Sequence, residues 1–272
     1  MQEIDLKLYL SQIVLPNANS AKGNNGKVLV IGGSKLFHAA SFWAASMASR
    51  IVDMVHFTSP VMENNDLMRI KAKEKFWDGI VVPYEEVEHY IKEDDCILIG
   101  PGMERGAETK KIIDSLLPKY PTKKWVVDGG ALQEVDPMLL NSNMIITPNI
   151  KELALLTIKL ENLNNGSLPC TILAKGPTDT ITSRTTGTLE HQKTAQISGG
   201  SPGMTKGGTG DVLAGLVAGL TAKSPAFASC VLASYTNKIA SEVLEQSTGT
   251  LFSPIDLIHQ ITVSLHQLLV AN

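Results

Sequence analysis

Residues 27–58 have the sequence KVLVIGGSKLFHAASFWAASMASRIVDMVHFT. Lys27–Ile31 is an apolar run that stops at Gly32-Gly33, which is typical of a buried strand in a parallel sheet. Ala39–Val52 then has the pattern of a helix, and Met54–Thr58 is a second apolar run. A strand, a helix and another strand in this order predict a βαβ unit and therefore a parallel sheet.

The same alternation continues after this unit. Three more apolar runs predict strands, and two further stretches predict helices. The strands are Cys96–Ile99, Trp125–Val127 and Met144–Ile146, and the helices are Tyr84–Lys92 and Thr109–Leu117. Proline residues at 118 and 121 mark the end of the second helix.

The second half of the chain changes its period. Short β-type runs separated by turn residues predict an antiparallel patch at one edge of the sheet: Thr171–Ala174, Thr180–Ser183 and Thr188–His191. Helical patterns return after Gly208, at Asp211–Leu220, Ala226–Glu245 and Pro254–Leu269. We find no internal repeat or long linker. We therefore predict one α/β domain, residues 1–272, with a mostly parallel central sheet and an antiparallel edge.

The composition excludes several classes of protein. The chain has 24 Lys and Arg against 27 Asp and Glu, so it lacks the basic surface that nucleic-acid binding requires. No apolar run reaches the ~18 residues of a membrane helix, and the start, MQEIDLKLYL, does not resemble a signal peptide. The three cysteines lie far apart without metal-binding spacing. We therefore expect a cytoplasmic protein with reduced thiols that binds neither membranes nor nucleic acid.

Four of the predicted strands end in polar or glycine-rich turns. These turns are Gly32-Gly33-Ser34, Gly100-Pro101-Gly102, Asp128-Gly129-Gly130 and Thr147-Pro148-Asn149. In open α/β sheets, ligands bind outside the carboxyl ends of the strands. Together the turns predict a ligand crevice that backbone groups can approach closely.

The segment KGGTGD at residues 206–211 directly precedes the helical run VLAGLVAGL. Glycines leave successive N–H groups able to face one anion, and a helix N-terminus adds partial positive charge. The segment therefore predicts a phosphate or oxyanion site formed by Gly207, Gly208, Thr209 and Gly210. Asp211 lies at the helix start, where its carboxylate could accept a proton from an attacking hydroxyl. The alternative is that Asp211 is only a helix N-cap.

Two other phosphate-binding motifs are absent. The chain contains no GxxxxGK[ST], and no GxGxxG follows its first strand. The sequence therefore supports neither a P-loop nor a dinucleotide-binding Rossmann loop.

Several segments occur in a characteristic order. They are KGNNGK at 22–27 leading into VLVIGGS, IGPGM at 99–103, VVDGGAL at 126–132, ITPNIKE at 146–152 and PGMTKGGTGDVLAGLVAGL at 202–220. Together they resemble the ADP/ATP-dependent NAD(P)H-hydrate dehydratase family, a branch of the ribokinase-like superfamily. The resemblance extends from about residue 16 to the end and implies a ribokinase-like three-layer sandwich. Many relatives carry an N-terminal epimerase domain, for which we expect no room in this chain.

The resemblance implies a lyase that repairs metabolites. Reduced nicotinamide cofactors become hydrated on the ring, and the family restores NADH and NADPH by phosphorylating the added hydroxyl and eliminating phosphate. ADP or ATP would be the phosphoryl donor, and Mg²⁺ would be held mainly by phosphate oxygens and water. Family habit and the small side chains of Ala39–Ser49 favour a homo-oligomer, and a separate protein could supply the epimerase.

The resemblance also implies roles for individual residues. Asp211 would be the catalytic base, and Gly207 to Gly210 would form the anion hole, with Gly210 also contacting the nucleotide. The nucleotide-binding turn would consist of Lys175, Gly176, Pro177, Thr178 and Asp179, and the hydrate would be contacted by Ala40, Gly102, Asn149 and Asp211.

One segment departs from the family pattern. The family usually has TPHPGE where this chain has TPNIKE at 147–152, so Asn149 replaces a histidine. The form TPNxxE instead resembles vitamin-type kinases of the same superfamily, which act on hydroxymethylpyrimidine- or pyridoxal-like alcohols. In those kinases Asn and Glu help to organise metal and phosphate, which would make Glu152 a possible magnesium ligand. Two alternatives therefore stay open: a vitamin-type kinase, and a nucleotide-binding protein without turnover.

Overall fold

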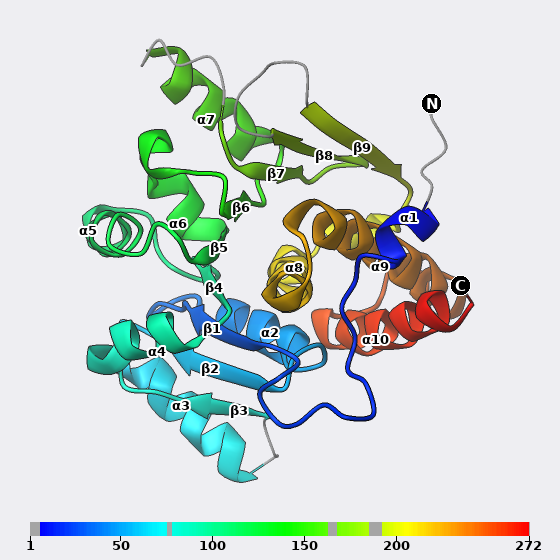
Figure 1. The fold of residues 1–272 in the computed structure, drawn as a ribbon, viewed down its shortest axis with the longest axis horizontal. Coiled ribbons are helices and arrows are strands. Elements are labelled where there is room, and N and C mark those ends of the chain that lie inside the picture. The colour runs from blue at the N-terminus through cyan, green and yellow to red at the C-terminus, as the bar shows by residue number, and fades with distance from the viewer. Residues whose placement is uncertain (1–5, 75–77, 163–167, 185–191, 272) are drawn as a thin grey trace.

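The computed structural model describes residues 6–74, 78–162, 168–184 and 192–271 (Figure 1). Within these residues, one nine-stranded sheet has the order β3-β2-β1-β4-β5-β6-β7-β8-β9. The pairs from β3 to β7 are parallel, and β8 and β9 are antiparallel to their neighbours. The strands are β1 Lys27–Ile31, β2 Met54–Thr58, β3 Gly79–Val81, β4 Cys96–Ile99, β5 Lys124–Val127, β6 Met144–Ile146, β7 Thr171–Ala174, β8 Thr178–Arg184 and β9 Gln192–Ser198. This arrangement confirms the predicted parallel sheet with an antiparallel edge.

Helices cover both faces of the sheet (Figure 1). The helices are α1 Leu6–Leu10, α2 His38–Ala48, α3 Met62–Glu74, α4 Val87–Glu93, α5 Ala107–Leu116, α6 Gly129–Glu134, α7 Ile150–Asn162, α8 Thr209–Lys223, α9 Ala226–Thr248 and α10 Pro254–Val270. Side chains of α2, α8, α9 and α10 form one apolar core with the sheet, and side chains of α4, α5, α6 and α7 form the other. The molecule is therefore a three-layer sandwich.

Strand β1 shows why the sheet is buried on both faces. Val28 and Val30 belong to the core beneath α2 and α8, whereas Leu29 and Ile31 belong to the core beneath α4. Successive side chains of a strand point to opposite faces, so a strand covered on both faces must be apolar at every position. The run KVLVI meets this requirement.

The small residues of α2 allow this helix to pack closely on α8. A Cβ added at Gly215 would overlap the carbonyl oxygen of Ala44, and one added at Gly219 would lie 2.8 Å from Ile51. The small side chains of α2 are therefore explained by packing within the chain. They no longer support the expected homo-oligomer.

Several elements were not predicted, or differ from the prediction. Helices α1, α3, α6 and α7 and strand β3 were missed, and the predicted run Thr188–His191 lies outside the described residues. On the side of β8 away from β7, the partner strand is β9, which begins at Gln192 and pairs from Thr178↔Ser198 to Arg184↔Gln192. Among the described helices, none has the length and apolar character that a bilayer span needs.

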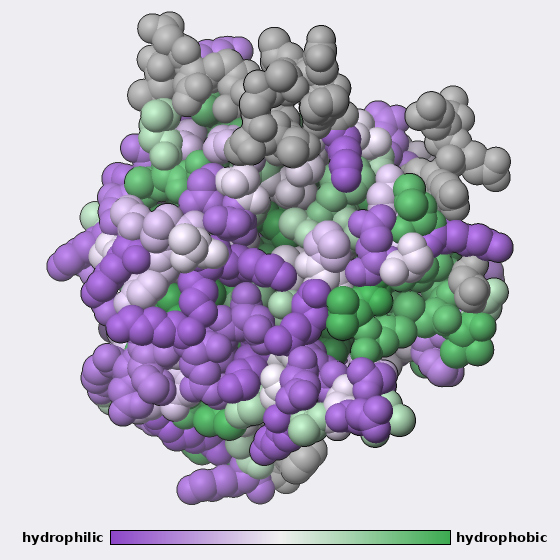
Figure 2. Space-filling view, in the orientation of Figure 1, coloured by the Kyte–Doolittle hydropathy of each residue, from purple (hydrophilic) through white to green (hydrophobic). Residues whose placement is uncertain are grey.

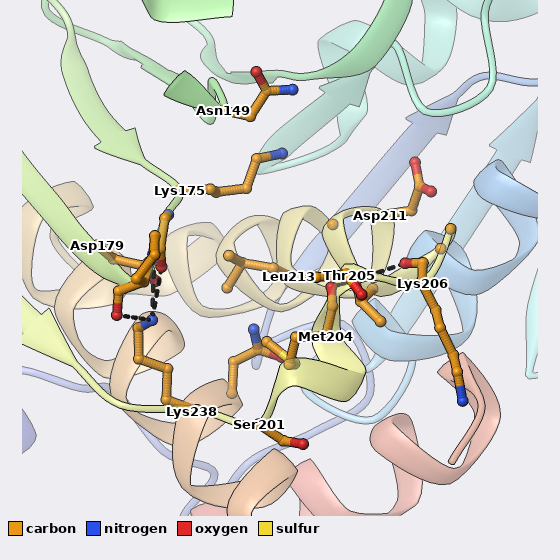
Figure 3. A pocket seen from close by; sticks show the side chains of 18 of the residues that line it. Asn149, Lys175, Asp179, Ser201, Met204, Thr205, Lys206, Asp211, Leu213 and Lys238 are labelled. Carbon is orange, nitrogen blue, oxygen red and sulfur yellow. Dashed lines mark hydrogen bonds and ion pairs between the residues drawn. The ribbon is translucent and has the colours of Figure 1, made fainter. Parts of the chain in front are cut away.

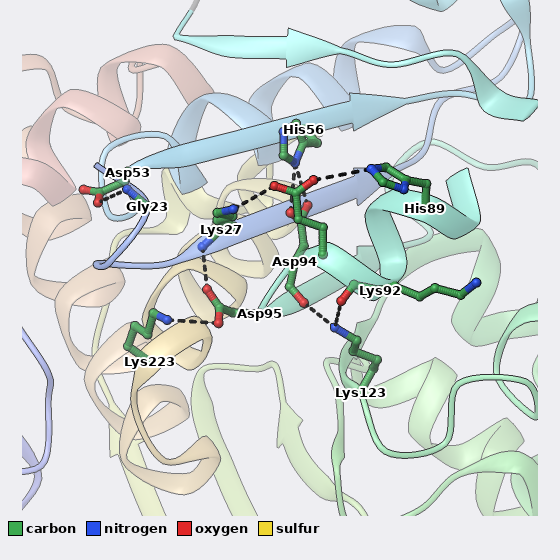
Figure 4. A network of polar contacts seen from close by, with 11 residues as sticks. Gly23, Lys27, Asp53, His56, His89, Lys92, Asp94, Asp95, Lys123 and Lys223 are labelled. Atoms are coloured by element: carbon green, nitrogen blue, oxygen red, sulfur yellow. Dashed lines mark hydrogen bonds and ion pairs between the residues drawn. The ribbon is translucent and has the colours of Figure 1, made fainter. Parts of the chain in front are cut away.

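A polar network lies at the amino ends of the central strands (Figure 4). Asp94 accepts a hydrogen bond from His56 at 2.9 Å, and both side chains are buried. Asp95 accepts from the Lys27 N–H at 2.9 Å and pairs with Lys223 at 3.0 Å. Burial raises the pKa of Asp94, although its bond to His56 opposes this. The network therefore joins neighbouring strands near their amino ends, away from the carboxyl ends where a ligand crevice is expected.

Apolar side chains also gather on the surface over α10 (Figure 2). Ile255, Val263 and Val270 are exposed on this helix. None of the three lines the cleft described below.

Candidate functional site

A cleft of about 920 Å³ opens at the carboxyl ends of β5 and β7, beside the N-terminus of α8 (Figure 3). Asp128 follows β5, Asn149 follows β6 and Lys175 follows β7. Asp211 lies in the first turn of α8, and Lys238 extends from α9. Of the four turns that predict a ligand crevice, those after β5 and β6 line this cleft, whereas those after β1 and β4 do not. The turns after β5 and β6 meet there because parallel strands bring their carboxyl ends to one edge.

The loop before α8 presents backbone N–H groups to the cleft. Gly207, Gly208 and Gly210 line it, and their N–H groups donate no hydrogen bond to any residue that the structure describes. The Thr209 hydroxyl donates to the carbonyl of Met204 at 2.7 Å and thus holds the loop. This geometry suits an anion, because the N–H groups at a helix start have no partner within the helix.

The ammonium of Lys206 does not take part in this anion site. It donates to the carbonyls of Thr250 and Phe252 at 2.6 and 2.8 Å, and its side chain points away from Asp211 (Figure 3). The anion site thus consists of backbone groups, and Lys206 holds the loop to the segment between α9 and α10.

Gly208 has a conformation that favours glycine. Its φ is 101°, in the left-handed region, and an added Cβ would contact the Trp43 ring and lie 2.7 Å from Pro254. Gly207 lies outside this region, and an added Cβ there would have no neighbour within 4 Å. The two adjacent glycines thus have different roles.

We expect Gly208→Ala to lower the free energy of unfolding by about 2–4 kcal/mol, through backbone strain and overpacking. Gly207→Ala should change it by less than about 1 kcal/mol, because the added methyl group meets nothing. Urea denaturation of both variants measures this difference. Equal losses would mean that the contact of Gly208 with Trp43 does not constrain the loop.

Asp211 is partly buried in the cleft, and its pKa is raised from 3.8 to about 7. Burial is the largest cause, followed by the negative charge of Asp128; Lys175 opposes the shift, and Glu152 adds to it weakly. A carboxylate with a pKa near neutrality can accept a proton and still be ionised at neutral pH. The site therefore favours the base interpretation of Asp211 over the N-cap interpretation, and Gly208 is in fact the N-cap.

Lys175 and Asp128 form an ion pair at 2.8 Å across the ends of β7 and β5. Asp128 is buried and also accepts a hydrogen bond from the Thr147 hydroxyl at 2.6 Å. Burial lowers the pKa of Lys175, but the Asp128 charge and hydrogen bond outweigh it, so the pKa is above its usual value. A Cβ added at Gly210 would lie 3.4 Å from the Lys175 Nζ. The ammonium therefore lies beside the anion site and stays charged.

The predicted nucleotide-binding turn lies only partly in the cleft. Lys175, Gly176, Pro177 and Asp179 line it, whereas Thr178 does not and instead bonds to Ser198 at 2.8 Å. The carboxylate of Asp179 accepts from the Gly176 N–H at 2.8 Å and from the Ser234 hydroxyl at 2.7 Å. Asp179 thus shapes the turn.

Lys238 completes this arrangement and was missed in the sequence. Its ammonium lies 3.4 Å from Asp179 and donates to the carbonyls of Gly176, Pro177 and Gly199 at 3.0, 3.2 and 3.1 Å. The side chain joins the β7–β8 turn to the loop after β9. A lysine inside a largely apolar helix pattern was the available signal.

Asn149 and Glu152 form a reciprocal cap at the start of α7. The Asn149 N–H donates to Glu152 at 2.9 Å, and the Glu152 N–H donates to the Asn149 Oδ1 at 3.0 Å. Glu152 also accepts from Gln133 at 2.7 Å. The segment TPNIKE therefore contains an N-x-x-E capping box, and both residues still line the cleft.

Ala40 and Gly102 lie together, but neither lines this cleft. A Cβ added at Gly102 would lie 3.1 Å from the Ala40 Cβ and would overlap the Phe37 carbonyl oxygen. The structure thus brings two of the predicted hydrate contacts to one point, at the ends of β1 and β4. The other two, Asn149 and Asp211, lie in the cleft.

Comparisons with known proteins agree with this fold and with the family resemblance. The family model described as NAD(P)H-hydrate dehydratase matches residues 28–263. A bifunctional NAD(P)H-hydrate repair enzyme of Methanocaldococcus jannaschii is 34% identical over 250 residues, which cover 90% of this chain and 49% of that protein. An ADP-dependent (S)-NAD(P)H-hydrate dehydratase of Nitrosopumilus maritimus is 30% identical over 273 residues, which cover 90% of each.

Two solved structures share the fold. A ribokinase-like superfamily protein of Enterococcus faecalis has a TM-score of 0.79 at 21% identity, covering 97% of this chain and 95% of that chain. The ADP/ATP-dependent NAD(P)H-hydrate dehydratase of Bacillus subtilis, co-crystallized with ATP/Mg²⁺, has a TM-score of 0.73 at 19% identity, with 97% and 95% coverage. The predicted ribokinase-like fold is confirmed.

The chain spans about half the length of the bifunctional relatives that it matches. The family resemblance of the sequence rests on separate motifs, whereas the family model matches nearly the whole chain, from β1 into α10. The chain belongs to the NAD(P)H-hydrate dehydratase family.

Proposed function

We propose that this chain dehydrates hydrated NADH and NADPH, with ADP or ATP as the phosphoryl donor. The observation that carries the proposal is Asp211, with its raised pKa of about 7, beside N–H groups at the start of α8 that donate to no residue in the described part of the chain. The names of the relatives support the same reaction.

In the first step, Asp211 takes the proton of the ring hydroxyl while the hydroxyl oxygen attacks the terminal phosphorus of the nucleotide. A new O–P bond forms as the bond between this phosphorus and the nucleotide oxygen breaks. The N–H groups of Gly207, Gly208 and Gly210 stabilise the charge on the transferred phosphoryl group, and Lys175 adds a positive charge beside them.

In the second step, the ring C–O bond breaks and phosphate leaves with its electron pair. The neighbouring ring carbon gives a proton to solvent water, and the electron pair of that C–H bond forms the double bond, which restores the dihydronicotinamide. Phosphorylation makes this step feasible because phosphate is a much better leaving group than hydroxide.

The residues of the cleft fit a magnesium ion that arrives with the nucleotide. Asp128 and Glu152 present carboxylates, the ligand type that Mg²⁺ prefers. Yet the described residues include no group of three side chains placed to hold a metal, and Glu152 already bonds to Gln133 and Asn149. Phosphate oxygens would supply most ligands, and the ion would neutralise phosphate charge.

The two alternatives are not favoured. The argument for a vitamin-type kinase rested on TPNIKE, and the capping box accounts for Asn149 and Glu152 without a metal. A nucleotide-binding protein without turnover gives no reason for a carboxylate of raised pKa beside an anion site.

The proposal is tested by incubating the protein with hydrated NADH and either ADP or ATP. We expect the dihydronicotinamide absorbance to return, with one phosphate released for each molecule restored. A stable phosphorylated pyrimidine or pyridoxal alcohol, with no repair of the hydrate under either nucleotide, would support the kinase instead.

Two substitutions of Asn149 separate its contact with the substrate from its role as a helix cap. Asn149→Ala should raise the Michaelis constant for the hydrate several-fold, because the amide that faces the cleft is lost. It should also lower the free energy of unfolding by about 1 kcal/mol, because the cap is lost. Asn149→Ser keeps a capping oxygen and should raise the Michaelis constant without this loss of stability. A normal Michaelis constant in both variants would remove Asn149 from the substrate site.

Two expectations about partners accompany this proposal. A homo-oligomer would appear in analytical ultracentrifugation as a mass that is a multiple of 29.3 kDa. If a separate protein supplies the epimerase, adding that protein to the repair assay should let a mixture of hydrate epimers react to completion.

A further inference from the structure

The glycine-rich loop at residues 203–208 has long backbone hydrogen bonds on either side of Lys206. The Lys206 N–H donates to the Gly203 carbonyl and the Thr209 N–H donates to the Lys206 carbonyl, both at 3.4 Å. Protein N–H···O bonds usually measure about 2.7–3.2 Å, and glycine has the greatest backbone freedom of any residue. The loop therefore needs support from outside to hold the N–H groups of the anion site in one arrangement.

Lys206 supplies such support through its side chain. Its ammonium donates to the carbonyls of Thr250 and Phe252, at 2.6 and 2.8 Å, and lies 5.6 Å from the centre of the Phe252 ring. Both residues belong to the segment between α9 and α10, residues 249–253. The side chains of Lys206 and Asp211 point in opposite directions (Figure 3), so this ammonium is committed to the segment rather than to an anion.

The same region packs against both ends of the loop. Phe252 is 1% exposed, and a Cβ added at Gly203 would lie 2.5 Å from its ring. At the other end, a Cβ added at Gly208 would lie 2.7 Å from Pro254, the first residue of α10. The loop therefore contacts this region at its first residue, at Lys206 and at its last residue.

The segment between α9 and α10 is itself held in place. The Ser253 N–H donates to the Asp256 Oδ2 at 2.7 Å, and the Asp256 N–H donates to the Ser253 Oγ at 3.4 Å, which forms a capping box at the start of α10. Buried side chains of α9 and α10 belong to the same apolar core as those of α8. Lys206 thus ties the loop to a fixed part of the fold.

We propose that Lys206 is a positioning residue for phosphoryl transfer. By holding the glycine-rich loop to the segment before α10, it keeps the N–H groups of Gly207, Gly208 and Gly210 aimed at the charge that develops on the transferred phosphoryl group. Such donors stabilise a transition state most when they are already in place, because no reorganisation is then needed during the reaction. This inference rests on the proposed function for its phosphoryl transfer and adds the residue that fixes the loop.

Steady-state repair assays of Lys206→Met test this role. Lys206 is exposed, so the variant should fold. We expect kcat to fall about 10–10²-fold, the effect of a small displacement of the reacting groups. The Michaelis constant for the hydrate should change less than about threefold, because the lost interaction acts on the transition state.

Lys124→Met is the matched control. The Lys124 Nζ also donates to two backbone carbonyls, those of Thr221 and Ala222 at 2.8 and 3.4 Å, but these lie at the other end of α8. This variant loses the same kind of contact from the same helix without touching the loop. It should keep the wild-type kcat.

Hydrogen exchange measured by mass spectrometry gives a readout that does not depend on activity. In Lys206→Met, peptides that cover residues 203–213 should exchange about 10-fold faster than in the wild type, because two hydrogen bonds no longer hold the loop. Lys124→Met should leave the exchange of these peptides unchanged.

Two outcomes overturn the positioning role. One is a kcat of Lys206→Met that falls no further than that of Lys124→Met. The other is a fall in kcat without faster exchange at residues 203–213, which would mean that only the charge of Lys206 matters. If the wild-type protein restores no dihydronicotinamide under either nucleotide, the proposed function fails, and the exchange rates alone decide whether Lys206 holds the loop.

Discussion

Asp211→Asn should lower kcat by about 10²–10⁴-fold, the contribution of a positioned general base. The amide keeps the shape of the carboxylate but cannot accept the hydroxyl proton. Affinity for ADP should be unchanged or higher, because the variant removes a negative charge near the phosphates. Steady-state kinetics and calorimetry measure the two effects separately. A variant that retains more than about a tenth of the wild-type kcat would show that Asp211 is not the base.

The same substitution should stabilise the fold at high pH. The pKa of Asp211 is 3.8 ordinarily and about 7 in the folded chain, so the folded state favours the neutral form. The free energy of unfolding therefore falls as the pH rises from about 4 to 7, because Asp211 ionises more readily in the unfolded chain than in the folded chain. We expect wild-type and Asp211→Asn melting temperatures to be similar at pH 4 and the variant to melt higher at pH 8. Wild type equal to the variant at both pH values would contradict the raised pKa.

Lys238→Met should cause the largest loss of stability among these predictions. Lys238 and Asp179 have side chains that are each 6% exposed, and removing one partner of a buried ion pair typically costs ~3–5 kcal/mol. Three carbonyl oxygens also lose a donor. The melting temperature should fall by roughly 6–20 °C, at ~2–4 °C per kcal/mol.

Lys223→Met is the control for this prediction. Lys223 pairs with Asp95 at 3.0 Å, but both side chains are 31% exposed. Breaking an exposed pair costs ~0–1 kcal/mol, so the melting temperature should change by a few degrees at most. Equal losses in the two variants would mean that the Lys238 pair does not hold the turn.

Local patterns in the sequence predicted the central strands and the helix that follows the glycine-rich loop. The fully apolar run of β1 forms the predicted strand, and the glycines at 207 and 208 directly precede α8. The strongly polar helix α3 was missed because it has little apolar surface to form a pattern. Its buried Asn64 and Asn65 instead bond to Ser59.

The electrostatic partners in the site could not be predicted in the same way. Lys175 and Asp128 are 47 residues apart and meet only because β5, β6 and β7 lie side by side. The raised pKa of Asp211 depends on that pair and on burial, so it required the fold. The pattern N-x-x-E at Asn149 and Glu152 predicts a capping box, which the structure contains. The same residues resemble motifs that organise a metal ion, and this resemblance pointed instead to a catalytic role.

The pH dependence of kcat/KM for hydrated NADH tests most directly whether Asp211 is the base of a nucleotide-dependent dehydratase. At saturating nucleotide, this profile reports the ionisations of the free hydrate and of the enzyme–nucleotide complex that binds it. The nucleotide is held at saturation, and the wild-type rate should fall tenfold per pH unit below the pKa of Asp211, which is about 7 in the chain without ligands. The residual rate of Asp211→Asn should lack this ionisation. A wild-type profile that stays flat from pH 8 to pH 5, or an Asn variant that keeps the same fall, would contradict the account.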